Sequence, residues 1–183
     1  MKLMTMARLV LAGFMFVLLT TGVAQAAQEF YVSITGTKQG PFKGEVTRKG
    51  FEGKIAGINF DYAVVSPRDP ASGMATNKRV HKPIKITKTW GASSTQLFTA
   101  LTTNEPLTAV VIDFFSMNSS GMVVLDHTVK LTNAFVTSIA HNYDALGAQA
   151  TVPPTETVEF VFQQIELINH IAKTGAMDSM SAP

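Results

Sequence analysis

The feature that most constrains the fold of this chain is a succession of segments with strand periodicity, separated by glycine and proline. Residues 29–35 (EFYVSIT) alternate apolar and polar side chains, which is typical of a half-buried strand. Further strand-like segments follow at 54–66, 79–90, 107–118, 122–144 and 156–168. The segment 122–144 is too long for one strand, and we expect two strands with a bend near Thr132 and Asn133. About seven or eight strands indicate an all-β sandwich or barrel.

One segment of the remaining chain has helical spacing, residues 93–106 (SSTQLFTALTTNEP). Leu97, Ala100 and Leu101 fall at i, i+3 and i+4, and Ser93 precedes Gln96 by the three residues of a capping box. A helix of about two turns is marginal in isolation, so we expect it to pack on a sheet.

The first 26 residues have the three parts of a secretory signal peptide. Lys2 and Arg8 precede an apolar run of 11 residues, and the segment ends on Ala24-Gln25-Ala26. The run is shorter than the ~20 residues of a spanning helix, so cleavage between Ala26 and Ala27 is favoured over an uncleaved membrane anchor. We therefore predict a periplasmic or extracellular protein without stable membrane insertion. Its parts are a leader (1–26), one domain (27–170) and a flexible tail (171–183).

Composition excludes several classes of function. Removing Lys2 and Arg8 leaves 13 basic and 13 acidic residues, and a neutral chain is a poor ligand for nucleic acids. The absence of cysteine rules out disulfides, thiol nucleophiles and cysteine-based metal sites. The four histidines are widely separated, and the chain contains no HExxH, GxSxG or phosphate-binding loop motif. We expect no catalytic residues, no metal and no cofactor.

The segment 77–90 (NKRVHKPIKITKTW) is unusual because it places five basic residues in eleven positions. One interpretation is a solvated edge strand, since lysine and proline at an edge prevent aggregation. The other is a charged face that meets carboxylates of a neighbouring subunit and thereby fixes the register of an assembly. Nucleic-acid binding is disfavoured because only Trp90 lies near these charges as a stacking residue.

Several strings, taken in order, resemble the Hcp (haemolysin-coregulated protein) family, the tube proteins of bacterial type VI secretion systems. They are FYVSITGTKQGPFKGE, RVHKPIKITKTWGASSTQLFTALTTNEPL, VVIDFF, VKLTNAFVTSI and EFVFQQIEL, and together they span most of residues 29–169. The resemblance implies a small β-barrel of two packed antiparallel sheets with one short helix on its flank. It further implies a non-enzymatic protein that forms hexameric rings, with stacked rings carrying effectors and bearing a spike. Family members normally assemble in the cytoplasm, so a leader peptide departs from the pattern.

If a ring forms, its contacts are expected along the basic strand, the last strand and the loop 66–77, which family members extend toward the neighbouring ring. The candidate residues are Ser66, Pro67, Arg68, Asp69, Arg79, His81, Lys82, Lys85, Lys88, Glu159 and Glu166. Two alternatives remain: an exported monomeric β-barrel that binds a small ligand or protein partner, and an envelope hydrolase, for which the chain offers no residue set.

Overall fold

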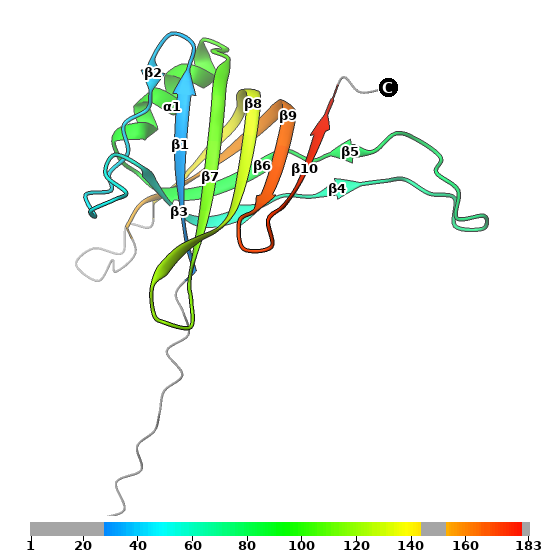
Figure 1. The fold of residues 1–183 in the computed structure, drawn as a ribbon. Coiled ribbons are helices and arrows are strands. Elements are labelled where there is room, and N and C mark those ends of the chain that lie inside the picture. Colours follow the sequence, from blue (N-terminus) through cyan, green and yellow to red (C-terminus); the bar gives the residue numbers. More distant parts are fainter. Residues whose placement is uncertain (1–27, 144–152, 181–183) are drawn as a thin grey trace, which may run out of the picture.

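The computed structural model describes residues 28–143 and 153–180, and Figure 1 shows their arrangement. The expected leader with its Ala26–Ala27 cleavage site therefore lies outside the described residues. The first strands are β1 (Glu29–Gly36), β2 (Gly40–Pro41), β3 (Ile55–Asp61), β4 (Val64–Val65), β5 (Val80–His81) and β6 (Ile84–Thr89). The later elements are α1 (Ala92–Thr102), β7 (Leu107–Met117), β8 (Val123–Asn142), β9 (Thr155–Asn169) and β10 (Thr174–Ser179). The all-β class with one short helix is confirmed.

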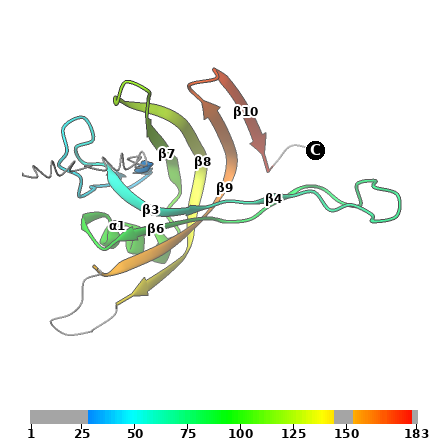
Figure 2. The ribbon, with the colours of Figure 1, turned by 90° about the horizontal axis from the view of Figure 1, so that it is seen from below.

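Six of the strands form a closed barrel. The order β9-β6-β3-β1-β7-β8 returns to β9 because β8 and β9 also pair, and every one of these pairings is antiparallel. Figure 2 shows the strands surrounding a common interior, with α1 on one side. The small β-barrel expected from the resemblance is confirmed, and the sheet that forms its wall is continuous.

The barrel interior is filled by apolar side chains from the inward-facing positions of each strand. The fully buried aliphatic residues of these strands include Val32, Ile55, Ile84, Leu107, Val110, Ile112, Leu131 and Val158. Phe30 lies against Gly57, where an added Cβ would come within 1.9 Å of the Phe30 ring. Gly57 thus leaves room for an aromatic cluster of Phe30, Phe60 and Phe114, and it does not end the strand in which it lies.

Helix α1 packs on the barrel through Leu97 and Ala100, which are buried. The expectation that Ser93 caps this helix is wrong. The helix begins after Gly91, whose backbone N–H donates to the Ser94 hydroxyl at 3.0 Å, and Ser93 is a buried residue of the first turn. Glu45 lies so close to Gly91 that a Cβ there would fall 1.9 Å from its carboxylate.

Three sequence-based boundaries differ from the structure. The segment expected to hold two strands is the single strand β8, although Asn133 has a φ of 50° where the bend was expected. The segment 79–90 is divided into β5 and β6 at Pro83, which has no N–H to donate to a sheet. A flexible tail was expected from residue 171 onward. This expectation is wrong for Thr174–Ser179, which forms β10 and pairs with β9.

The described part of the chain has no helix that is both long and apolar enough to span a membrane.

Candidate assembly surfaces

The second half of the basic segment forms β6, which lies inside the barrel wall between β3 and β9. The edge-strand interpretation is therefore wrong for β6, because both of its sides pair with other strands. Ile84, Ile86 and Lys88 face the interior and are buried, whereas Lys85 faces outward. The two lysines of β6, Lys85 and Lys88, therefore have different surroundings.

Lys88 is buried in the single chain, with 2% of its surface exposed. Its Nζ donates to Oε1 of Glu156 at 2.9 Å, and Glu156 lies directly opposite it on β9. The Ser94 hydroxyl also donates to this carboxylate at 2.8 Å, and Nε2 of His141 lies 3.0 Å from its other oxygen. The expectation that Lys88 lies at a subunit interface is wrong, because its side chain is part of an internal charge network beneath α1.

Lys85 forms an ion pair with Glu159 at 2.8 Å on the outer surface of the barrel. The hydrogen bond and the charge of Glu159 raise the pKa of Lys85 above its ordinary value of 10.5. Lys82 is exposed, and its backbone N–H donates to the Ala63 carbonyl at 2.9 Å. Glu166 is half-buried on β9 opposite Met177 of β10. Lys85 and Glu159 therefore have partners within the chain, while the Lys82 side chain points to solvent.

The loop expected at residues 66–77 is the outer part of a hairpin, residues 64–81, whose base is the β4–β5 pair. The N–H of Thr76 donates to the Pro67 carbonyl, and the backbones of Arg68 and Ala75 form an antiparallel β-bridge. The Asp69 carboxylate accepts the N–H groups of two following residues of its turn, which lowers the pKa of Asp69. Ser66 is exposed near the base of the hairpin. These contacts give the hairpin a defined internal structure.

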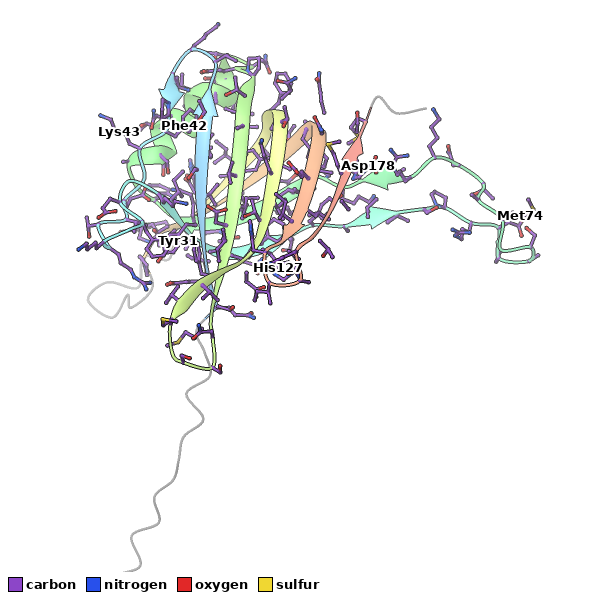
Figure 3. All side chains as sticks on the ribbon, viewed as in Figure 1. Tyr31, Phe42, Lys43, Met74, His127 and Asp178 are labelled. Atoms are coloured by element: carbon purple, nitrogen blue, oxygen red, sulfur yellow. The ribbon has the colours of Figure 1, made fainter. Side chains whose placement is uncertain are left out.

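The hairpin extends away from the barrel, on the side opposite α1 (Figures 1 and 2). Met74 lies at its tip and is 71% exposed (Figure 3). Val64, Val65 and Val80 near the base are each about half exposed. Exposed apolar side chains therefore lie both at the tip and at the base of the hairpin.

The base of the hairpin is joined to the last strand by a cluster of polar side chains. The Arg79 guanidinium donates from Nε and Nη2 to the two carboxylate oxygens of Asp178, which lies on β10. His81 Nε2 lies 3.1 Å from the same carboxylate, and Nδ1 lies 2.6 Å from the Tyr62 hydroxyl. Since a carboxylate only accepts hydrogen bonds, the proton of His81 facing Asp178 is on Nε2. We call these four residues the clasp.

Electrostatics favour the charged form of Asp178 in this cluster. Hydrogen bonds from Arg79 are the main reason that the pKa of Asp178 is lowered from 3.8 to about 2. Burial and the nearby Asp178 carboxylate raise the pKa of Tyr62 above 10.0, so its hydroxyl is protonated at neutral pH. Arg79 and His81, expected at a subunit interface, thus hold two parts of one chain together.

A cleft of about 460 Å³ lies between the hairpin base and the β9–β10 pair. Tyr62, Val64, Leu167 and Met177 give it apolar walls, and Asp178 is among its polar lining residues. Sequence reasoning missed Tyr62 and Asp178, since an isolated tyrosine and a carboxylate in a supposed tail give no local signal. It also missed the exposed aromatic pair Trp90 and Phe98, which lines a shallow pocket on α1.

A family model described as the type VI secretion system effector Hcp matches residues 31–168. The chain belongs to the Hcp family. The relatives of this Hcp-family protein include the Major exported protein of Pseudomonas aeruginosa PAO1, 33% identical over 165 residues that cover 84% of the chain and 95% of the relative. A crystal structure titled Hcp protein has a TM-score of 0.78 at 26% identity, and it is matched over 86% of this chain and 100% of its own. The secreted protein Hcp3 from Pseudomonas aeruginosa has a TM-score of 0.71 at 28% identity, over 85% of this chain and 100% of its own.

Family membership confirms the resemblance drawn from the sequence strings. The protein is a structural tube protein of the type VI secretion system and not an enzyme. The family and the exported relative also confirm that it is an exported protein. Because Hcp-family proteins form rings, membership supports self-association of this chain.

Proposed function

We propose that six copies of this chain close into a ring and that rings stack head to tail into a tube. Effectors would occupy the lumen of the tube, and a spike protein would bind its end. The observation that carries this proposal is the projecting hairpin with Met74 exposed at its tip. Stacking on another copy would remove this apolar surface from water.

Head-to-tail assembly needs two different surfaces on each copy. The hairpin and α1 lie on opposite sides of the barrel, so they supply such a pair (Figure 2). Lys78 and Lys82 are exposed on or next to the hairpin, and complementary charge on a second copy would fix the register of the contact. The outward Lys85–Glu159 pair adds a further polar contact point.

Negative-stain electron microscopy of the chain beginning at Ala27 tests this function. We expect six-subunit rings and, at high protein concentration, stacks of rings. In a shortened variant, an Asn-Gly turn joins Pro67 to Thr76, which are already hydrogen-bonded neighbours. This variant should form rings without stacks.

A matched pair of point variants separates the hairpin tip from general surface hydrophobicity. Met74→Ser should reduce stacking, whereas Met122→Ser, at an exposed methionine of the β7–β8 turn, should not. A chain that stays monomeric would contradict the ring and favour the exported binding module instead. Stacks that form equally well without the hairpin tip would refute its role.

Export through the N-terminal leader is part of the same proposal. Its support is the order of charges, apolar run and small residues in positions 1–26. Mass spectrometry of the protein recovered outside the cytoplasm should find Ala27 as the first residue. Recovery of a chain that still begins at Met1 would contradict cleavage.

A further inference from the structure

The last strand and the hairpin are far apart in sequence but meet at the clasp (Figure 3). Asp178 accepts two hydrogen bonds from Arg79 and lies beside His81, while Arg79 Nη2 also donates to the Ser179 carbonyl at 3.2 Å. β10 is held in place independently, since it pairs with β9 over six residues. A rigid strand of the barrel therefore presents a carboxylate to the hairpin base.

The hairpin has few other attachments in the described chain. Across residues 28–143 and 153–180, the side-chain hydrogen bonds that leave residues 64–81 end on Tyr62, Asp178 or Ser179. His81 additionally packs edge-on against Phe162 of β9. Three of these five hydrogen bonds end on Asp178, so one carboxylate accounts for most of the polar attachment of the hairpin.

The backbone at the hairpin base is suited to bending. The ladder of β3 stops at Asp61 before β4 begins at Val64, and that of β5 stops at His81 before β6 begins at Ile84. Between these breaks, the Lys82 N–H to Ala63 carbonyl bond crosses the base, and Pro83 has no N–H to offer. A two-stranded hairpin is marginally ordered without tertiary support, so a fixed direction needs a contact such as the clasp.

We propose that Asp178 is a positioning residue, through which β10 acts as a strut that fixes the direction of the hairpin relative to the barrel. The functional part of this inference rests on the proposed role of the hairpin in stacking. If the strut is released, the hairpin samples several directions and its tip is no longer presented to a second copy. The C-terminal strand then controls stacking of rings without itself forming the contact between them.

The direction of the hairpin can be measured by the distance between two spin labels. The natural chain has no cysteine, so labels at Met74→Cys on the tip and Thr137→Cys on the exposed face of β8 are unambiguous. Dilution with unlabelled chain keeps labels on different copies apart. With Asp178 present, we expect one narrow distribution of distances.

Asp178→Asn should replace that narrow distribution with a broad one, and Arg79→Gln should do the same from the other side of the clasp. The matched control is Asp126→Asn, which neutralises a half-buried carboxylate of β8 outside the clasp. It should leave the distribution narrow. Circular dichroism of each variant verifies that the barrel is folded. If both clasp variants fold and keep the narrow distribution, the strut does not exist.

Electron microscopy of the same clasp and control substitutions, made in the unlabelled chain that keeps Met74, distinguishes this inference from the proposed function. If both hold, Asp178→Asn forms rings like those of the natural chain but loses stacks, and Asp126→Asn keeps both. If the natural chain forms no rings while Asp178→Asn still broadens the distribution, the strut stands and the proposed function fails. If the natural chain stacks and Asp178→Asn stacks equally well, the strut has no part in assembly.

Discussion

At the scale of single residues, the basic segment divides into charges with different roles. Lys88 lies in the interior with Glu156, Lys85 lies on the surface with Glu159, and Arg79 joins the hairpin to β10. Burying an ion pair costs desolvation free energy, and removing one partner leaves the other charge uncompensated. The same residue type, three positions apart on one strand, is therefore expected to contribute very differently to stability.

Replacing Lys88 by methionine should lower the free energy of unfolding by about 3 kcal/mol, because Glu156 would remain buried without its cation. Urea unfolding at a fixed chain concentration measures this change. The matched control is Lys85→Met, which removes a half-exposed partner of Glu159 and should cost less than about 1 kcal/mol. Equal losses in the two variants would contradict the assignment of Lys88 to an internal network.

The position of Lys88 could have been derived from the sequence. Side chains alternate between the two faces of a strand, so Lys88 shares a face with Ile84 and Ile86. A count of all charges along the segment does not separate the side chains that face the interior from those that face solvent. The partner Glu156 could not be derived, because pairing across β6 and β9 depends on the register of distant strands.

At the scale of secondary-structure elements, Glu105 stabilises the turn between β1 and β2. This buried carboxylate accepts the N–H groups of Lys38 and Gln39 at 2.6 and 2.9 Å and the Gln39 side-chain amide at 2.9 Å. Burial by itself raises the pKa of Glu105, but these hydrogen bonds outweigh it and the pKa lies below 4.5. The charged carboxylate thus ties the turn to the connection between α1 and β7.

Glu105→Gln should destabilise the protein by about 1–3 kcal/mol, since an amide cannot accept all three hydrogen bonds. Urea unfolding provides the measurement, and hydrogen exchange should show faster exchange at the N–H groups of Lys38 and Gln39. An unchanged midpoint together with unchanged exchange would mean that the carboxylate does not hold this turn.

The clasp should respond to acid with a defined sign. The pKa of Asp178 is depressed to about 2, so its contribution is fully present above 3.8 and is lost as the pH falls through about 2. The charged and titratable groups facing it are Arg79 and His81, with Tyr62 behind His81. The narrow distance distribution of the hairpin should therefore persist from pH 7 to pH 4 and broaden toward pH 2. Broadening that is complete at pH 5 would contradict the clasp.

Most elements could be predicted from local sequence, and those that could not depend on distant contacts. Alternation identified β1, and the strand-like segments 107–118 and 156–168 identified β7 and β9. β10 (TGAMDS) has neither alternation nor β-branched residues beyond Thr174, and it is a strand because β9 offers it an edge. The cap of α1 was placed two residues late, since Ser94 bonds back to Gly91 and no sequence rule excluded Ser93.

At the scale of the whole molecule, the barrel presents two unlike sides, the hairpin and α1 (Figure 2). Its interior is filled by buried apolar side chains. The family and the non-enzymatic role were accessible from the ordered strings of the sequence and are confirmed. Which charges meet another copy was not accessible, because several of the charged side chains singled out in the sequence have partners within their own chain.

The central claim is that this Hcp-family chain works as a ring. The most direct test is the absolute mass of the chain from Ala27 to Pro183, measured by light scattering coupled to size exclusion at low and moderate salt. The account predicts a mass of six chains at both salt concentrations. A single-chain mass at every concentration would contradict it and leave an exported barrel that acts alone.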